Sequence, residues 1–519
     1  MYDYKFIEEK WNRIWTNNKT FKVLRDRLKP PFYALVGYNS PSIDSFIKMD
    51  ANARYQRMCG ANVLFPSLRE NMNIIHGIGM DYQKIISKDF LYKSQNQLLD
   101  YLVNKGVIYT EVMDNITYYK AEINDFYETI NKMSLPEATK EVKKEFFQLH
   151  EGYNLFLEVV DKESIIRLFL EELENLYLST FIVLPYNHDL AFSITNEEEL
   201  EDLELFIQNP NEEELIFTGS YVVNPITEQA MPLFVGSVEK ILLGTPAIDS
   251  KALAYATKYD IEVLSMDYFD DFSLHLRNQA KDTLEKMNML EPATLKNTTE
   301  LTIATKETDH LIFEECFNSV YFLLAPIASN IDLDINVIDY KDEINKWLPI
   351  DCFIFQDGYE LLSSLLIHHL FHKADFIHNN IFAKKIIYHN PKIVHNHDNS
   401  DLCRLMVFSN ISSDVGMNIL NNIWHLYSKQ LLDSFSMLDG SYMQLKKDCK
   451  QAYDKRDYNM VMAYVSRFMT LVNEKKGLSY EQAFGLLKIL SPLVPYICEE
   501  IYQAVFNNLD SIAYEDWPL

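Results

Sequence analysis

The sequence is poor in glycine and in positive charge. Only 14 of its 519 residues are glycine, whereas about 7% is usual in globular proteins. Loops that cradle phosphate need glycine, because the backbone must approach the anion closely. The formal net charge is −27, from 48 Lys and Arg against 75 Asp and Glu. Nucleic-acid affinity depends on neutralising phosphates with Lys and Arg, so RNA binding would require the basic residues to gather on one face.

Paired cysteines and long apolar runs are also missing. The cysteines are scattered, and none forms a Cys-x-x-Cys pair: Cys59, Cys316, Cys352, Cys403, Cys449 and Cys498. This pattern predicts neither a disulfide framework nor a zinc ribbon, and it favours a reducing compartment. The longest apolar runs, such as TFIVLP and VYFLLAPIA, are too short to span a membrane, and the N-terminus lacks the apolar core of a signal peptide. We therefore expect a cytoplasmic protein that makes no membrane contact.

Four patterns follow one another along the chain. Strands and helices alternate from 32 to about 125, and the same pattern returns from about 300 to 408. Short apolar strands dominate 153–265, and 411–507 has the spacing of amphipathic helices. We predict an α/β protein in which a Rossmann-like core is split by a β-rich insertion and followed by an α-helical bundle. The predicted segments are 1–152, 153–290, 291–410 and 411–519.

Several collinear segments resemble one family. From the N-terminus they are YDYKFIEEKWNRIWTNNKTFK, ARYQRMCGANVLFP, LHEGYNLFLEV, TPAIDSKALAYATKYDIEVL, WLPIDCFI, LSPLVPYICEEIYQ and SIAYEDWPL. In this order they resemble leucyl-tRNA synthetase, a class I aminoacyl-tRNA synthetase. The resemblance implies that the insertion is an editing (CP1) domain and that the helical bundle is an anticodon-binding domain. An unrelated Rossmann-like turn is the alternative, but it does not explain the collinear matches.

The resemblance breaks where the family binds ATP and its amino acid. The segment after FYALVGYNSPS is IDSFIKMD, which has neither His nor Gly, whereas the family has a His-x-Gly-His signature there. The Lys-Met-Ser-Lys-Ser loop, whose lysines stabilise charge on the transferring phosphates, is missing. The lysine pair 384–385 matches residues that precede this loop, and FQDGYELL replaces a Gly-Gly-x-Glu-His turn. We predict a degenerate site with no catalytic residue, marked by Tyr38, Asn39, Ser40, Asp357, Glu360, Lys384 and Lys385.

The insertion departs from the family in a similar way. The family's threonine-rich strand end, which holds a misacylated tRNA end, aligns with FLEELENLY. Glutamates stand there in place of hydroxyls, and they would repel a tRNA 3′ end. The family's aspartate that anchors the amino group aligns with an alanine. We predict a degenerate editing site at Glu171, Glu174, Asn175, Asp249 and Ala252.

Histidines in the second half could supply another chemistry. His368 and His372 are spaced i, i+4, which suits metal ligands on one helix face. No Glu lies between them as in zinc peptidases, and the stretch aligns with a core helix of the family. We therefore predict no metal site and no cofactor.

The missing signatures favour a catalytically degenerate paralogue, a pseudoenzyme that acts through a protein partner, because a fold can outlast the chemistry of a few loops. The alternative is a residual or altered synthetase. It would use Lys384, Lys385 and the histidines, either to ligate leucine to tRNA with ATP or to accept a preformed aminoacyl-adenylate or aminoacyl-tRNA. The bundle carries basic residues that could contact tRNA: Lys446, Lys447, Lys450, Lys455, Arg456, Lys475 and Lys476. Because the net charge is strongly negative, we expect no tight tRNA binding at cellular salt.

Overall fold

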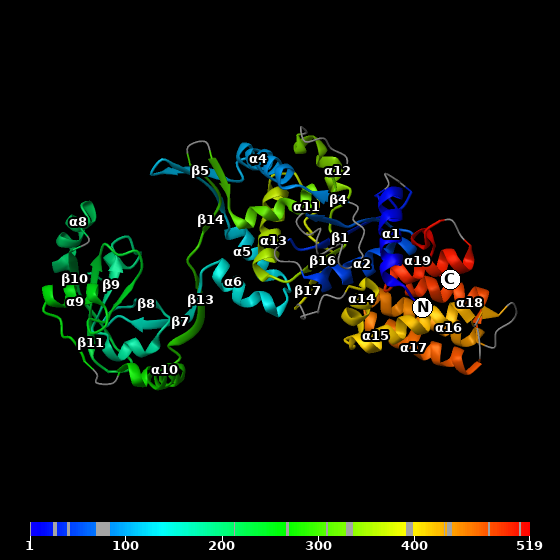
Figure 1. Ribbon diagram of the computed structural model, residues 1–519. Coiled ribbons are helices and arrows are strands. Elements are labelled where there is room, and N and C mark those ends of the chain that lie inside the picture. Colours follow the sequence, from blue (N-terminus) through cyan, green and yellow to red (C-terminus); the bar gives the residue numbers. More distant parts are fainter. Residues whose placement is uncertain are drawn as a thin grey trace. The chain divides into compact units, whose positions relative to one another are not determined.

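The computed structural model describes residues 2–23, 28–38, 42–68, 84–211, 213–265, 269–307, 310–327, 336–390, 398–429, 431–432, 438–475, 478–507 and 510–518. The chain forms two compact units (Figure 1). The first unit consists of Met1–Phe146 and Thr299–Leu519, and the second unit is Phe147–Thr298. Within the described ranges, no helix is both long enough and apolar enough to cross a membrane.

The first unit contains a parallel sheet with the strand order β17-β16-β1-β2. Its strands are β1 (Pro31–Val36), β2 (Asn62–Leu64), β16 (Cys352–Phe355) and β17 (Ile386–Tyr388). The central strands are the apolar runs PFYALV and CFIF, as expected for strands covered on both faces. Ala34 pairs with Cys352 in register, so β1 and β16 end at the same edge. At that edge begin the helices that follow them, α2 (Ile43–Met58) and α13 (Gly358–Lys373).

A second sheet of this unit is antiparallel, with the order β15-β14-β6-β5. Its strands are β5 (Tyr109–Met113), β6 (Ile116–Glu122), β14 (Glu300–Glu307) and β15 (His310–Phe313). The other elements before the bundle are β3 (Pro66–Leu68), β4 (Lys84–Ile86), α4 (Lys88–Asn104), α5 (Asn124–Lys132), η2 (Glu137–Thr139), α6 (Lys140–Phe146), η5 (Glu315–Val320), α11 (Tyr321–Leu324), η7 (Val337–Tyr340) and α12 (Lys341–Asn345).

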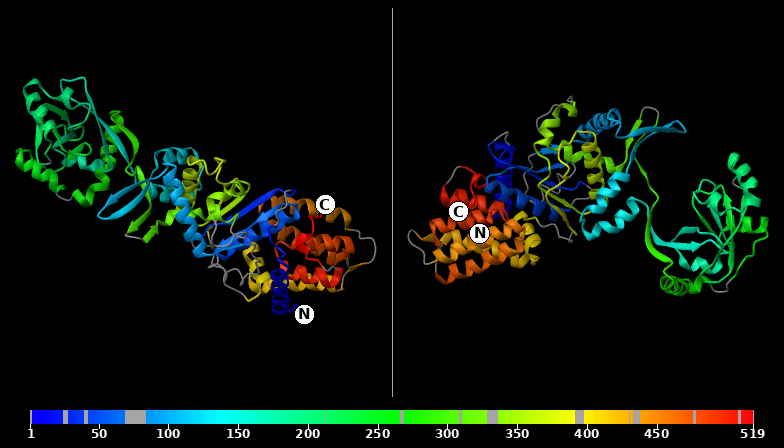
Figure 2. Two further views of the ribbon diagram at one scale, coloured as in Figure 1. Left: turned by 90° about the horizontal axis from the view of Figure 1, so that it is seen from above. Right: turned by 180° about the vertical axis from the view of Figure 1, so that it is seen from behind.

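The C-terminal part of the first unit is a helical bundle. Its elements are α14 (Ser400–Ser409), α15 (Ser413–Lys429), β18 (Leu431–Leu432), α16 (Asp439–Lys455), α17 (Tyr458–Lys475), β19 (Leu478–Ser479), α18 (Tyr480–Leu490), α19 (Pro495–Phe506) and η8 (Ile512–Tyr514). The first helix of the chain, α1 (Tyr4–Asn18), packs against α19 in every view (Figures 1 and 2). The fully buried Trp11 and Trp15 donate their indole N–H groups to Glu500 at 2.9 Å and to Glu499 at 3.1 Å. The two ends of the chain are thereby joined.

Buried charges connect the parallel sheet to the bundle. Asp50 on α2 accepts from Arg54 Nε at 2.7 Å and forms an ion pair with Arg404 Nη1 of α14, also at 2.7 Å. Arg404 is fully buried, and it also donates to the carbonyl oxygens of Pro492 at 2.7 Å and Leu493 at 2.9 Å. Burial raises the pKa of Asp50, but the two guanidinium groups outweigh that effect and hold its pKa below the usual value. The three side chains form one charged network between α2 and α14.

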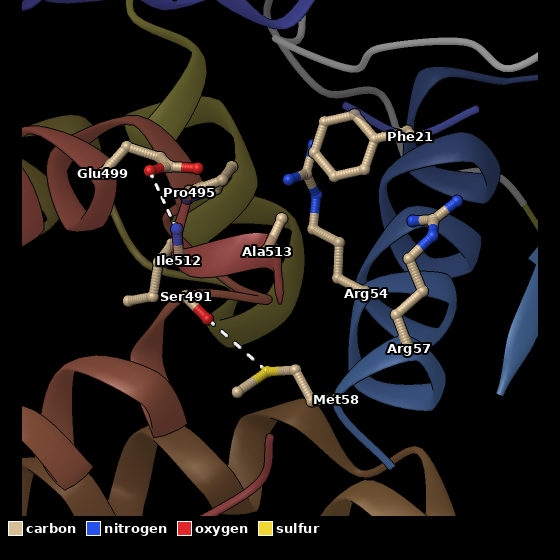
Figure 3. Close-up of a pocket in the computed structure, with 9 residues that line it drawn as sticks. All are labelled: Phe21, Arg54, Arg57, Met58, Ser491, Pro495, Glu499, Ile512 and Ala513. Atoms are coloured by element: carbon tan, nitrogen blue, oxygen red, sulfur yellow. Dashed lines mark hydrogen bonds between the residues drawn. The ribbon is translucent and has the colours of Figure 1, made fainter. Parts of the chain in front are cut away.

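Residues of α2 and α19 line a small pocket in which Arg54 stacks on an aromatic ring (Figure 3). The guanidinium carbon of Arg54 lies 4.5 Å from the ring centroid of Phe21. On the bundle side, the carboxylate of Glu499 accepts from Ile512 N at 3.1 Å, and Ser491 donates to the sulfur of Met58 at 3.6 Å. These contacts join α2 to α19 and to the C-terminal tail.

The second unit contains two sheets. One has the order β10-β11-β9-β12 and the other has the order β13-β7-β8. The strands are β7 (Leu149–Glu158), β8 (Ile165–Leu170), β9 (Phe181–Pro185), β10 (Leu215–Val223), β11 (Ala230–Gly236), β12 (Leu242–Gly244) and β13 (Leu290–Lys296), and the helical elements are η3 (Leu173–Leu178), α7 (Ala191–Ile194), η4 (Glu197–Glu199), α8 (Leu200–Gln208), α9 (Ser250–Lys258) and α10 (Phe269–Lys286). Every residue of β9 is buried because both faces of the strand are covered. Phe181 and Val183 pack with residues of α9, and Ile182 and Leu184 pack with β7 and β8.

The second unit begins and ends on neighbouring strands. The first strand, β7, pairs with the last strand, β13, in antiparallel register from Leu149↔Lys296 to Leu155↔Leu290. Beyond the ladder, Asn297 N donates to Gln148 O at 3.3 Å. The chain therefore enters and leaves this unit at one place.

We predict that the first unit loses stability as the pH rises from about 5 to about 8. Burial, together with the nearby Asp401 carboxylate, raises the pKa of Glu8 to about 7, although hydrogen bonds from Ser400 oppose the shift. Burial also raises the pKa of Asp401 to about 6. In this pH window the folded state binds more protons than the unfolded state, so stability is greatest at the acidic end and is lost as the pH passes through the folded-state pKa. The measurement is the melting temperature across this range.

The matched variants are Glu8→Gln and Glu9→Gln. In Glu8, one carboxylate oxygen accepts from Ser400 N at 2.7 Å and the other accepts from Ser400 Oγ at 3.0 Å. In the first variant the amide oxygen of glutamine can accept from Ser400 N and its NH2 group can donate to Ser400 Oγ, but the side chain cannot titrate. We expect the decrease in melting temperature to be smaller in Glu8→Gln and unchanged in Glu9→Gln, because Glu9 is exposed. Equal decreases in the parent protein and in Glu8→Gln would contradict the prediction.

Candidate functional site

The edge where β1 and β16 end is where an open α/β sheet normally binds its ligand. The predicted residue Tyr38 lies there, directly after β1, while Asn39 and Ser40 fall outside the described residues. The backbone N–H of Tyr38 donates to the carboxylate of Glu360, and its hydroxyl donates to Glu315 O at 3.0 Å. Burial raises the pKa of the Tyr38 hydroxyl well above its usual value, so this hydroxyl stays neutral.

Glu360 and Asp357 lie at the start of α13, as part of this edge. The side chain of Glu360 is only 1% exposed, and a Cβ atom on Gly37 would collide with its carboxylate. Asp357 is the N-cap of α13 and accepts from Tyr359 N at 2.9 Å. A helix N-terminus presents unpaired N–H groups and partial positive charge, which attract anions. Here the chain's own carboxylates lie at the N-terminus of α13.

The N-terminus of α2 is also covered by side chains of the protein. Ser42 caps the helix by accepting from Ser45 N at 3.3 Å, and it also donates to the carboxylate of Asp44. Asp44 is buried and pairs with the imidazole of His389, which directly follows β17. Gln356 donates to both serine hydroxyls, with a distance of 2.5 Å to Ser45 Oγ.

The predicted site residues do not include Asp44, Gln356 or His389. Two of these residues could have been predicted from their positions, because Gln356 and His389 are the first residues after β16 and β17. The carboxyl ends of parallel strands meet at one edge, so polar residues in these positions come together.

The predicted lysines lie at the opposite end of the strands. Lys384 and Lys385 precede β17, and Lys384 Nζ forms an ion pair at 2.7 Å with Asp351, which precedes β16. Asp351 also accepts from Tyr33 N at 2.7 Å. The structure therefore brings Tyr38, Asp357 and Glu360 together but places the lysine pair at the amino-end edge.

Of the histidines of α13, His368 packs in the core, His369 is half-buried and His372 is exposed. His368 is 5% exposed, and its ring centroid lies 5.8 Å from that of Phe382 and 6.4 Å from that of His372. Burial lowers the pKa of His368 to about 4, so its ring is neutral near pH 7. Among the residues that the structure describes, no group of three His, Cys, Asp or Glu side chains could hold a metal ion.

In the second unit, the predicted glutamates are bound to basic side chains. Glu174 is buried on η3 and binds Arg277 through two hydrogen bonds, at 2.6 and 2.7 Å. Glu171 lies 2.9 Å from His150 Nδ1. Asn175 Nδ2 donates to Glu172 Oε2 at 3.2 Å.

The two predicted editing residues near α9 have ordinary structural contacts. Asp249 is the N-cap of α9 and accepts from Lys251 N at 2.7 Å and from Ala252 N at 3.2 Å. Ala252 is fully buried in an apolar cluster with Phe181 and Phe234. The contacts of Asp249 and Ala252 are therefore complete within the protein and do not require a ligand.

Comparisons with known protein families give one match over the β-rich second unit and one match over the C-terminal helical bundle. The family model "Leucyl-tRNA synthetase, editing domain" matches residues 144–311, and "Anticodon-binding domain of tRNA ligase" matches residues 438–519. The chain is a leucyl-tRNA synthetase-like protein. The fold of this leucyl-tRNA synthetase-like protein is similar to that of the Agrobacterium radiobacter K84 agnB2 leucyl-tRNA synthetase, solved as a ternary complex with tRNA and LeuAMS. The TM-score is 0.62 at 15% identity, over 100% of this chain and 90% of that chain.

These matches confirm the predicted resemblance and the predicted fold class. The leucyl-tRNA synthetase-like chain is a mixed α/β protein with an editing domain followed by a helical anticodon-binding domain. The segment limits 1–152, 153–290, 291–410 and 411–519 stay a prediction.

We predict that Arg277→Met destabilises the second unit. The substitution leaves the carboxylate of Glu174, whose side chain is 5% exposed, without its guanidinium partner. Removing one partner of a buried ion pair costs about 3–5 kcal/mol. Arg277 itself is 41% exposed, so we expect a smaller loss of about 2 kcal/mol because water partly screens the pair. Urea denaturation followed by circular dichroism is the measurement.

The control is Lys281→Met, on the same helix. Lys281 pairs with Glu285 at 3.8 Å, and neither partner is buried, since the two side chains are 40% and 51% exposed. This substitution should cost less than about 1 kcal/mol. In the Arg277→Met background, Glu174→Gln should restore part of the lost stability. Equal losses of stability in Arg277→Met and Lys281→Met would contradict a stabilising role of the Glu174–Arg277 pair.

Proposed function

We propose that this leucyl-tRNA synthetase-like protein is a pseudoenzyme. It keeps the scaffold of the family, has lost leucine activation and editing, and acts in the cytoplasm through a protein partner. The observation that supports this most directly is the pair of buried carboxylates, Asp44 and Glu360, near the helix N-termini at the edge where β1 and β16 end. An open α/β sheet would receive the phosphates of ATP at this edge.

The electrostatic consequence is repulsion of a polyphosphate. Two unit charges about 5 Å apart repel by about 3 kcal/mol at an effective dielectric constant of about 20. Asp44 pairs with the imidazole of His389, and Lys48 Nζ lies 3.4 Å from Nδ1 of that imidazole, so Lys48 offsets the charge of one of the two carboxylates. Lys384 is bound to Asp351 at the opposite edge, where it is not placed to offset negative charge on a phosphate. Binding of a nucleotide at the proposed site is therefore unfavourable.

The second unit supports the loss of editing. The unit holds 28 Asp and Glu against 9 Lys and Arg, a formal net charge of −19. By the sequence resemblance, Glu171 and Glu174 align with the strand end on which the family holds the tRNA end, and Ala252 aligns with an aspartate and cannot anchor an amino group. A polyanionic tRNA end would have to approach a strongly negative domain.

A second candidate function is a residual or altered synthetase-type activity. It is favoured by the matches to an editing domain and to an anticodon-binding domain, since both domains are those of a tRNA ligase. Such an activity would need a different route for ATP, or a preformed aminoacyl-adenylate or aminoacyl-tRNA.

Leucine-dependent exchange of pyrophosphate into ATP tests the proposal. We expect no exchange above a control without enzyme, and no rise in melting temperature with ATP and Mg²⁺ or with a leucyl-adenylate analogue. An active leucyl-tRNA synthetase is the positive control in both measurements. The double variant Asp44→Asn/Glu360→Gln should also be inactive, because removal of the carboxylates does not supply the missing lysine loop. Exchange above the blank, or a rise of several degrees with one ligand, would favour the second candidate.

Titration with leucine tRNA tests the expected lack of tight tRNA binding. Lys446, Lys447 and Lys450 lie on α16, but Lys450 pairs with Asp454 at 3.2 Å, which reduces the free positive charge of that helix. We expect no sub-micromolar complex in filter binding at about 0.15 M salt, where the Debye length is about 8 Å. A polyanion such as heparin serves as the specificity control. Sub-micromolar binding that heparin does not abolish would contradict this part of the proposal.

A further inference from the structure

The second unit contains a cavity of about 600 Å³ that the proposed function does not use. It lies against β10 and β11 and beside the segment that follows α9. These elements can be located by their labels in Figure 1. None of the five predicted editing residues lines the cavity. Its size is within the range of pockets that bind small ligands or single peptide segments.

Aromatic rings form one wall of the cavity. The ring centroids of Tyr221 and Phe217 are 5.5 Å apart, those of Phe217 and Phe234 are 5.5 Å apart, and those of Phe234 and Tyr259 are 5.6 Å apart. All four residues line the cavity, and Tyr221 is 42% exposed. The faces of aromatic rings attract cations, and a planar guanidinium can also stack on them.

Carboxylates stand at the same cavity. Asp260 and Glu262 line it and are exposed. Among the described residues, no Lys or Arg forms an ion pair with either of them. The nearby Lys258 donates to the carbonyl oxygen of Glu213 at 2.8 Å, and its Nζ lies 5.5 Å from the ring centroid of Tyr259. The two carboxylates therefore present negative charge next to the aromatic wall.

A buried hydroxyl completes the lining. Thr180 is 8% exposed and lines the cavity, and its Oγ1 has no hydrogen-bond partner among the described residues. A buried polar atom without a partner is uncommon, because the loss of its hydration is not compensated. A ligand N–H group that reaches Thr180 Oγ1 would supply the missing hydrogen-bond partner.

We propose that this cavity binds an arginine side chain from a basic segment of a partner protein. The aromatic wall stacks the guanidinium, Asp260 and Glu262 neutralise its charge, and Thr180 accepts one of its N–H groups. This inference rests on the proposed function, in which the chain acts through a protein partner. The net charge of −19 on the unit favours a basic partner at longer range.

The chemistry of the lining separates arginine from other ligands. A phosphate or a nucleic acid would be repelled by the two carboxylates. A purely apolar segment would neither neutralise the carboxylates nor form a hydrogen bond with Thr180. Lysine would pair with the carboxylates but would stack less well, since its ammonium is a compact and strongly hydrated charge.

A titration with short peptides tests the inference on the whole chain. The reporter is the methyl signal of Met231, a fully buried residue that lines the cavity, in protein labelled at its methionine methyl groups. The probe is acetyl-Gly-Gly-Arg-Gly-Gly-amide, and the matched peptides carry citrulline or lysine in place of arginine. We expect the arginine peptide to shift the signal with a Kd of about 1 mM, and the neutral citrulline peptide to bind at least about tenfold more weakly. Free L-arginine should bind no more tightly than the peptide, because its α-ammonium group and α-carboxylate are attracted and repelled by Asp260 and Glu262 to a similar extent.

Paired charge variants assign the effect to the cavity. Asp260→Asn/Glu262→Gln should weaken the arginine peptide by about tenfold, and asparagine fits the positive φ of 53° at position 260. The control Asp202→Asn/Glu204→Gln removes the same charge from α8, away from the cavity, and should have no such effect. The inference is overturned by a missing shift up to about 10 mM, by equal binding of arginine and citrulline, by equal effects of the two variants, or by tighter binding of free arginine. Pyrophosphate exchange on the same sample separates the two proposals, because it tests the pseudoenzyme without involving the cavity.

Discussion

The ion pair between Asp50 and Arg404 is the constraint on which the first unit depends. Asp50 lies on the helix that follows β1, and Arg404 lies on the first helix of the bundle. Such a pair adds little net stability compared with apolar residues, but loss of one partner leaves an unpaired charge in a low dielectric. The two residues must therefore be kept together. Their pairing fixes α2 against the bundle and so sets where the N-terminus of α2, with Ser42 and Asp44, meets the sheet.

Once α2 and α13 are fixed, their N-termini need partners for the unpaired N–H groups. In a nucleotide-binding protein of this architecture a phosphate can fill that role. Here Ser42 and Asp357 cap the helices, and Asp44 and Glu360 supply buried negative charge beside them. Because these side chains take the role that a bound phosphate would have at the helix N-termini, they would explain how the fold can persist without a nucleotide.

The fold was accessible from the sequence because it depends on local patterns. The runs PFYALV and CFIF indicate buried parallel strands, and the apolar spacing after residue 411 indicates helices. The site was only partly accessible. Asp44 and His389 are 345 positions apart, and Glu174 and Arg277 are 103 positions apart, so no local pattern shows that they meet. Lys384 and Lys385 were grouped with Glu360 by resemblance, but the direction of β17 places them at the other edge of the sheet.

The pairing of β7 with β13 has a consequence for how this chain can change over time. Both ends of the second unit lie side by side, and a hydrogen bond joins Gln148 to Asn297. A domain with adjacent ends can be replaced, enlarged or deleted through a short linker without a change in the path of the host chain. Mutations in the inserted domain and mutations in its host can therefore be selected almost independently of each other.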